Sequence, residues 1–289
     1  MDSNRFNQIL VVDSIPKGEY NTARRLFEDL ETYATAYSPS PAVRYVRVEN
    51  AAEFLQCILI AKGNAEQHDI IPMLQIECHG HEDGFQFADR SLVDRDELKV
   101  PITELNVATG LNLMIAVAAC TGGALAKVMR MGDRAPFWGL IGPTRMLTAG
   151  ELQKAYAALY LTLLSTKSLA DAVKAMEQAT APGLFWRTTS QDLFEKVWRS
   201  YKSEHCTAAA LEMRGRRMMD HLRESGTSPL PSMDELLSRF IAYEPIAFAR
   251  YRQTFFMCDI YPEHSYRFPI EQSHEGRQCS LIHIQTITS

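Results

Sequence analysis

The sequence predicts an α/β protein: a mostly parallel β-sheet flanked by helices, followed by a mainly helical C-terminal appendage. Short apolar runs alternate with segments of helical periodicity over residues 8–180. Some of these runs are apolar almost throughout, which is typical of strands covered on both faces. After the segment TAPG at 180–183, the alternation of strand-like and helix-like segments gives way to a mainly helical pattern. We therefore divide the chain into a sheet domain of residues 1–183 and an appendage of residues 184–289.

The strands expected in the sheet are short, apolar and bounded by turn-forming residues. They lie at 8–14, 42–50, 71–79, 111–120 and 135–143. The segment 84–98 alternates around a turn and predicts a short β-hairpin. In the appendage, residues 184–257 are expected to be mainly helical, with a break at 225–232, and the tail that ends in CSLIHIQTITS has a β-like pattern.

The helices between the strands begin at recognisable capping pairs, in which a polar residue is followed three positions later by an acidic one. These pairs are Asn50 with Glu53, Thr148 with Glu151, and Ser168 with Asp171. Strands that alternate with helices favour right-handed crossovers and a parallel sheet.

Composition narrows the class of protein. The chain has 289 residues, of which 46% are hydrophobic and 22% charged, as is usual for a globular protein with a sizeable core. Its net charge of −5 argues against nucleic acid as a direct partner. The basic cluster MRGRRMM at 213–219 is interpreted as a solvated helix face.

Several features predict a cytoplasmic protein. No basic region followed by a long apolar core is present at the N-terminus, so no signal peptide is expected. The longest apolar run, at 111–120, is too short to cross a bilayer, and no membrane association is expected. Six cysteines are scattered without CxxC pairs, which indicates free thiols in a reducing compartment. We expect neither a cofactor nor a bound metal.

Two chemically active residues end two of the expected strands. His79 ends the expected strand at 71–79, and Cys120 ends the strand at 111–120. In a parallel sheet the carboxyl ends of strands lie at one edge, so neighbouring strands would bring the imidazole and thiol close together. Such a pair suits a base and a thiol nucleophile. The backbone amides of Gly80 and Cys120 are candidates for holding an oxyanion.

Other interpretations of these residues stay open at this point. Cysteine is one of the most buried residue types, so a cysteine at a strand end is often structural. His79 and His81, with Cys78, also suggest a metal site, although a further ligand at recognisable spacing is missing. Alternation along a strand would point Cys78 away from His79. Spacing alone does not decide between these interpretations.

The sequence CHGHEDGF at 78–85, then DRSLVDRDEL at 89–98 and AACTGG at 118–123, resembles the caspase-like cysteine peptidases. It is most similar to their bacterial CHAT-domain branch. The segment FWGLIGPTRML and the helices after it, at 137–177, resemble the remainder of a CHAT domain. The resemblance covers residues 8–180 in matching order.

The resemblance implies a caspase-like fold and a cysteine endopeptidase that cleaves peptide bonds through a thioester. It assigns the nucleophile to Cys120, the general acid–base to His79, and the oxyanion hole to the amides of Gly80 and Cys120. His81 has no catalytic role in this pattern and is expected to be a loop residue.

The resemblance also points to residues of a substrate pocket. Members of the family that cut after Arg or Lys carry an acid two residues before the cysteine, where this chain has Ala118. Asp13, at the end of the first strand, is a candidate acid for a basic P1 residue, with a turn or capping role as the alternative. Arg145 would instead favour an acidic P1 residue. The P1 preference stays open.

The leading hypothesis is a peptidase gated by an activating protein or ligand, acting on protein substrates in a bacterial defence (including antiviral) or cell-death system. The alternative is a catalytically silent CHAT scaffold that mediates protein–protein assembly. A metal-dependent hydrolase that uses Cys78, His79 and His81 is the third hypothesis. We expect the appendage to serve recognition or gating.

Overall fold

The computed structural model of the chain describes residues 5–35, 39–81, 83–120 and 132–270. The chain divides into two compact units. The first unit extends to Ser190, and the second consists mainly of the residues from Gln191 onward.

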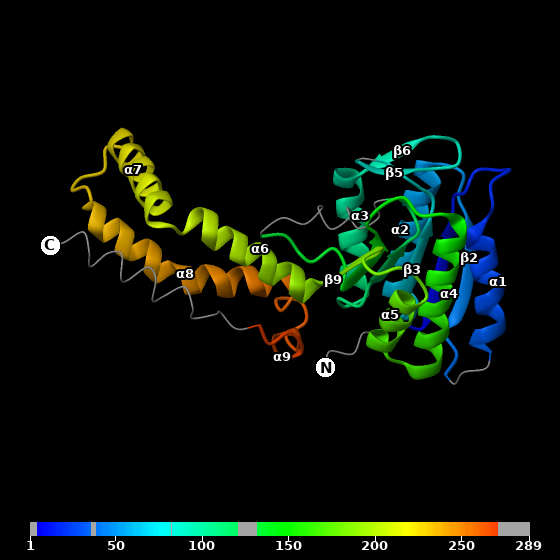
Figure 1. The fold of residues 1–289 in the computed structure, drawn as a ribbon. Helices are drawn as coiled ribbons and strands as arrows, with labels where there is room; N and C mark the ends of the chain where they lie inside the picture. The colour runs from blue at the N-terminus through cyan, green and yellow to red at the C-terminus, as the bar shows by residue number, and fades with distance from the viewer. Residues whose placement is uncertain (1–4, 36–38, 82, 121–131, 271–289) are drawn as a thin grey trace. The chain divides into compact units, whose positions relative to one another are not determined.

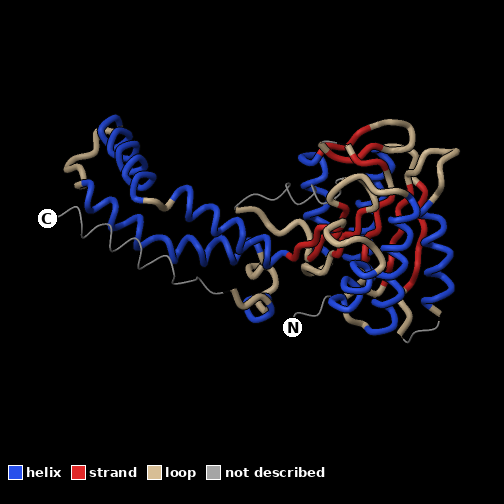
Figure 2. Tube along the Cα trace, viewed as in Figure 1, coloured by secondary structure: helices blue, strands red, loops and turns tan. Residues whose placement is uncertain are grey.

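Among the described residues, six strands form the sheet of the first unit, shown as red segments in Figure 2. Their order is β2-β1-β3-β7-β8-β9. The first five strands in this order run parallel to one another, and β9 is antiparallel to β8. The strands are β1 (Gln8–Asp13), β2 (Ala42–Arg47), β3 (Pro72–Glu77), β7 (Met114–Val117), β8 (Gly139–Pro143) and β9 (Phe185–Thr189). The predicted α/β class with a mostly parallel sheet is confirmed.

Helices cover both faces of this sheet, as Figure 1 shows. One layer contains α1 (Thr22–Ala34), α4 (Ala149–Thr166) and α5 (Leu169–Gln178), and α4 contacts both of the others. The other layer contains α2 (Ala51–His68) and α3 (Arg95–Ala108), which pack together. From β1 to β2 the chain moves toward one edge of the sheet, and from β2 through β3 to β7 it moves toward the other. Right-handed crossovers therefore place α1 on one face and α2 and α3 on the opposite face.

The predicted capping pairs are confirmed. The Asn50 side chain accepts a hydrogen bond from the Glu53 amide at 2.9 Å, where α2 begins. Thr148 and Glu151 form a reciprocal capping box at the start of α4. The Ser168 side chain likewise accepts from the Asp171 amide at the start of α5.

A second, three-stranded antiparallel sheet follows β3 in the sequence. It is formed by β4 (His79–Gly80), β5 (Gly84–Gln86) and β6 (Leu92–Asp94). The predicted hairpin is correct for β5 and β6, but residues 95–98 are the first turn of α3 instead. The missed signal is the capping box of Asp94 and Glu97, a pattern that starts a helix.

The two compact units divide after Ser190, several residues beyond the boundary expected at 183. β9 (Phe185–Thr189) pairs along the whole of β8, and the Thr144 amide donates to the Leu184 carbonyl at 2.9 Å. This segment therefore belongs to the first unit, which ends at Ser190. Its pairing partner is distant in sequence, so the local helical pattern on its C-terminal side concealed the strand.

The second unit is helical, as predicted. It contains α6 (Ser190–His205), α7 (Ala208–Glu224), α8 (Met233–Phe255) and α9 (His264–Arg267), with the expected break between α7 and α8. Aromatic rings form its interior: Phe194 contacts Phe248, Phe255 and Phe256 at centroid distances of 5.2–5.7 Å. The expected β-like tail lies outside the described residues.

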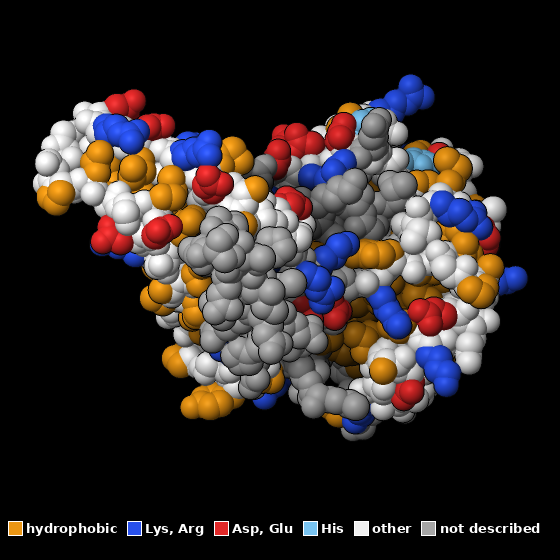
Figure 3. All heavy atoms as spheres, turned by 60° about the vertical axis from the view of Figure 1, so that its left-hand side comes forward, with side chains coloured by type: hydrophobic (Ala, Val, Ile, Leu, Met, Phe, Trp, Pro, Cys, Tyr) orange, Lys and Arg blue, Asp and Glu red, His pale blue; other side chains and the backbone are white. Residues whose placement is uncertain are grey.

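The surface of the second unit carries both hydrophobic and charged side chains. Hydrophobic side chains are interspersed with charged ones on the face that Figure 3 turns forward. The basic cluster on α7 is exposed, as predicted: Arg216 pairs with Glu212 at 2.6 Å, and Arg214 lies over the Phe240 ring at 4.9 Å. Within the described part of the chain, every helix is too short or too polar to cross a membrane.

A chain of buried polar groups links β3 to the helices of one layer. The Tyr160 hydroxyl donates to Gln75 Oε1 at 2.9 Å, and Gln75 Nε2 donates to Glu77 Oε1 at 2.7 Å. Thr22 Oγ1 donates to the other Glu77 oxygen at 2.6 Å. Burial raises the pKa of Glu77 to about 7, although the hydrogen bonds from Thr22 and Gln75 act in the opposite direction.

We expect the substitution Glu77→Gln to stabilise the protein at neutral pH relative to acidic pH. Between its ordinary pKa of 4.5 and about 7, the unfolded chain releases the Glu77 proton while the folded chain keeps it. Rising pH therefore favours unfolding of the wild type over this window, by at most about 3 kcal/mol, and an amide lacks this dependence.

Urea unfolding of the full chain between pH 4.5 and pH 8 measures this effect. Glu31→Gln, an exposed glutamate on the same layer of helices, is the matched control and should follow the wild type. A constant difference between Glu77→Gln and the wild type across this range would contradict the expectation.

Candidate functional site

The carboxyl ends of the parallel strands lie at one edge of the sheet. β1 ends at Asp13, β3 at Glu77 and β7 at Val117, and β3 lies between the other two strands. The segments that leave this edge carry the predicted His79 and Cys120. This is the position where α/β proteins assemble reactive side chains.

The structure brings the predicted histidine and cysteine segments together. β3 and β7 are neighbours, and the Ala118 amide extends their pairing by donating to the Ile76 carbonyl at 2.8 Å. Beyond them, a methyl group added to Gly80 would lie 1.8 Å from the Cys120 carbonyl oxygen and 2.7 Å from its amide nitrogen. No side chain fits there, so the glycine is required by the close approach of the two backbones.

His79 does not end the central strand, as the sequence had suggested. β3 ends at Glu77, and His79 begins β4, where it pairs with Gln86 of β5. Its imidazole is 45% exposed, and Nε2 lies 3.1 Å from each carboxylate oxygen of Glu19. The histidine is therefore positioned by the small antiparallel sheet and by the loop after β1.

His81 occupies a different environment from His79. It lies in the turn between β4 and β5, where its backbone exchanges hydrogen bonds with Gly84 at 3.0 and 3.3 Å. Its exposed ring accepts a hydrogen bond from the Asp83 amide at 3.3 Å through Nδ1. His81 is thus a turn residue, as expected from the sequence.

The cysteines differ in their suitability as nucleophiles. Burial raises the pKa of the Cys57 thiol to about 11 and raises that of Cys78 further. Burial also raises the pKa values of Cys206 and Cys258. These thiols are therefore held in the protonated, less reactive form. Cys120 is partly exposed, as Cys206 and Cys258 also are, but it stands at the edge of the sheet where loops leave it.

The structure gives no support to a metal site at Cys78, His79 and His81. Across the part of the chain that the structure describes, no group of three His, Cys, Asp or Glu side chains is arranged to hold a metal ion. Cys78 is buried, with 7% exposure, whereas His81 is exposed on the turn.

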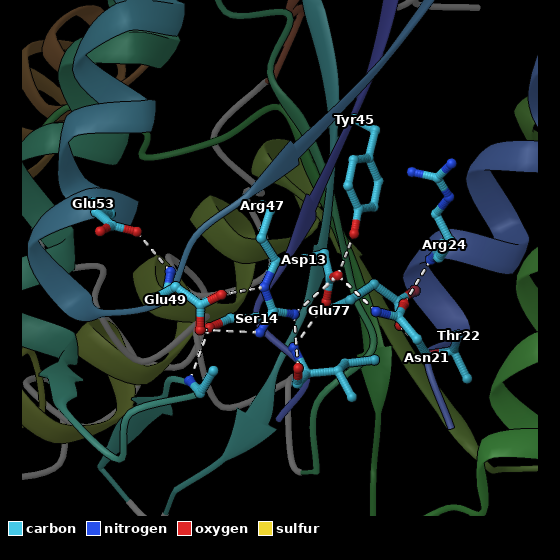
Figure 4. Close-up of polar contacts among 12 residues, drawn as sticks. Asp13, Ser14, Asn21, Thr22, Arg24, Tyr45, Arg47, Glu49, Glu53 and Glu77 are labelled. Carbon is cyan, nitrogen blue, oxygen red and sulfur yellow. Dashed lines mark hydrogen bonds and ion pairs between the residues drawn. The ribbon is translucent and has the colours of Figure 1, made fainter. Parts of the chain in front are cut away.

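The surroundings of Asp13 favour its alternative role as a structural residue over that of a pocket acid. Its side chain is fully buried, and Figure 4 shows Tyr45, Arg47 and Asn21 directed toward it. Arg47 Nη1 lies 3.0 Å away, Asn21 Nδ2 donates at 2.7 Å, and the Tyr45 hydroxyl also donates to it. The Ile15 amide donates to the other oxygen at 2.8 Å. The carboxylate is engaged on all sides, so a substrate cation would have to displace Arg47.

The remaining pocket candidates lie at the same edge of the sheet. Ala118 is buried and forms part of the extended β3–β7 pairing. Arg145 follows β8, is exposed, and donates from Nη1 to the Met146 carbonyl at 3.0 Å. Residues 121–123 of the AACTGG motif lie outside the described residues.

Glu19 was not predicted from the sequence as a residue of the site. It lies in the loop between β1 and α1, and its partner His79 is 60 positions away in the chain. The available signal was its position after the first strand, because loops at the carboxyl edge converge on one site. This signal does not single out Glu19 among the polar residues of the loop.

A comparison of the chain with models of known protein families found no match. A comparison with curated proteins also found no match.

Gly80→Ala should destabilise the protein by about 2–3 kcal/mol, because the added methyl group would overlap backbone atoms of Cys120. The matched control is Gly63→Ala in α2, where an added methyl group meets nothing within 4 Å. That control should stabilise by about 0.5–1 kcal/mol, since alanine favours a helix. Urea unfolding of both variants checks the pair, and equal effects would refute the close backbone contact.

Asp13→Asn should cost about 2–4 kcal/mol of stability, because it leaves the Arg47 charge without its buried partner. Glu49→Gln removes the other carboxylate bound to Arg47, and the Glu49 side chain is 44% exposed. That control should change stability by less than about 1 kcal/mol. The two free energies of unfolding are to be compared at one pH, and a larger loss from Glu49→Gln would contradict the structural role of Asp13.

Proposed function

We propose that this protein is a cysteine endopeptidase of the caspase-like, CHAT-domain type. Cys120 is the nucleophile, and His79 is the general acid–base. The observation that carries the proposal is the contact between Gly80 and the Cys120 backbone. It holds the histidine segment against the cysteine segment at the carboxyl edge of two neighbouring strands.

The proposed reaction proceeds in two steps. His79 accepts the proton of the Cys120 thiol, and the sulfur attacks the carbonyl carbon of the scissile peptide bond. The C–N bond then breaks as His79 gives this proton to the departing amine. This leaves a thioester between the acyl group and Cys120. A water molecule, deprotonated by His79, then attacks the thioester and releases the carboxylic acid and the thiol. The amides of Gly80 and Cys120 would stabilise the oxyanion in both steps.

The partner and pathway belong to the same proposal and rest on the sequence resemblance. The substrate is a protein, and an activating protein or ligand orders the loops of the site in a bacterial defence or cell-death system. With Asp13 committed to Arg47, Arg145 is the remaining charged candidate for contact with P1, and it favours an acidic residue. The helical second unit is the candidate module for recognition or gating.

Cys120→Ala should abolish cleavage, and His79→Ala should lower turnover at least about a hundredfold, the usual size of a general acid–base contribution. His81→Ala, in the exposed turn, should retain most of the activity. New protein N-termini in a bacterial lysate treated with wild-type or Cys120→Ala protein identify a cleavable sequence. Turnover of that sequence then ranks the three folded variants.

The outcome separates the peptidase from the alternative of a silent scaffold. Identical N-termini with wild-type and Cys120→Ala protein would favour the scaffold. Comparable losses from His79→Ala and His81→Ala would instead contradict the assignment of a single catalytic imidazole.

A further inference from the structure

The carboxylate of Glu19 is directed at the candidate catalytic imidazole. Both of its oxygens lie 3.1 Å from His79 Nε2. The two side chains are 50% and 45% exposed, and an ion pair this exposed contributes little to stability on average. The significance of the contact therefore depends on whether Glu19 is held in place.

The loop that carries Glu19 is anchored at both ends. At its start, the Ile15 amide donates to Asp13, and Arg47 Nη1 donates to the Ile15 carbonyl at 2.7 Å. At its end, Asn21 caps α1 and donates to Asp13 at 2.7 Å. The Tyr20 hydroxyl, adjacent to Glu19, donates to Gln153 Oε1 of α4 at 2.8 Å.

The turn within the loop also directs Glu19 toward β4. The Glu19 amide donates to the Pro16 carbonyl at 3.2 Å, and Gly18 adopts a φ of +96°, which favours glycine. The carboxylate is thus presented from a fixed turn, and the imidazole is presented from a paired strand.

We infer that Glu19 is a positioning residue for His79. It accepts a hydrogen bond from Nε2–H, which fixes the ring and its tautomer and leaves Nδ1 as the nitrogen that exchanges a proton with the Cys120 thiol. It also stabilises the imidazole when protonated, as the third member of a catalytic triad does. This inference rests on the proposed function of His79 and Cys120.

The same region holds several other titratable groups. Those on the segments that flank or follow His79, or lie beside it at the sheet edge, are Asp13, Lys17, Glu77, Cys78, His81, Asp83 and Cys120. Glu19 is the carboxylate that forms an ion pair with the His79 ring among the described residues.

The test uses the full chain with Glu19→Gln, which keeps the shape of the side chain and removes its charge. We expect kcat to fall about tenfold, the effect of one hydrogen bond to a charged group, with KM nearly unchanged. The limb of the pH profile that belongs to the imidazole should move to lower pH, because the protonated ring loses its carboxylate. Glu19→Asp keeps the charge and should restore the position of that limb.

Two further variants distinguish positioning from a structural role. Glu19→Gln should cause no additional loss in a His79→Ala background, because the residue acts through the imidazole. Glu28→Gln breaks an exposed ion pair with Arg24 on α1 and should behave as wild type. A loss confined to KM, or an undiminished loss in the His79→Ala background, would overturn the inference.

A readout without substrate separates this inference from the proposed function. The rate at which iodoacetamide alkylates Cys120, measured by mass spectrometry across pH, reports how protonation of the imidazole changes the reactivity of the thiol. An inflection that moves to lower pH in Glu19→Gln and vanishes in His79→Ala supports the positioning role, even in a protein without peptidase activity. The same alkylation profile in Glu19→Gln and wild type overturns the role, whether or not the protein cleaves peptides.

Discussion

The buried carboxylate of Asp13 is the constraint on which the edge of the sheet depends. A buried charge is costly unless it is paired and hydrogen-bonded, and here β2 supplies Arg47 and Tyr45 while the start of α1 supplies Asn21. The chain can leave β1 along few paths that satisfy all of these groups at once. The loop before α1 is consequently fixed, and with it the position of Glu19.

A second constraint acts through the absence of a side chain. Gly80 lets β4 approach the backbone of Cys120 more closely than any other residue would permit. The candidate site is therefore assembled from a parallel sheet, which delivers Cys120, and a small antiparallel sheet, which delivers His79. The rigidity of both sheets favours a reproducible distance between thiol and imidazole, and such a distance is what proton transfer requires.

Buried polar groups recur near this edge and link strands to helices. Glu77, one residue before Cys78, joins β3 to α1 through Thr22 and, by way of Gln75, to α4 through Tyr160. Because each of these groups has a partner, the polar chain specifies how the helices align over the sheet without leaving a buried group unsatisfied. The loop side chain of Tyr20 reaches the same helix α4.

The sequence by itself determined the features that arise from local interactions. Strands were predicted from apolar runs, and helix starts from capping pairs such as Thr148 with Glu151, because each depends on neighbours a few residues away. The placement of His79 and Cys120 near the carboxyl edge also followed from those runs, although β3 ends at Glu77 and β7 at Val117. The tertiary structure alone decided which strands are adjacent, that β9 joins the sheet, that Asp13 is enclosed, and that Glu19 meets His79 across 60 positions of chain. Such pairings are selected by the packing of whole elements, and no local pattern encodes a partner so far along the chain.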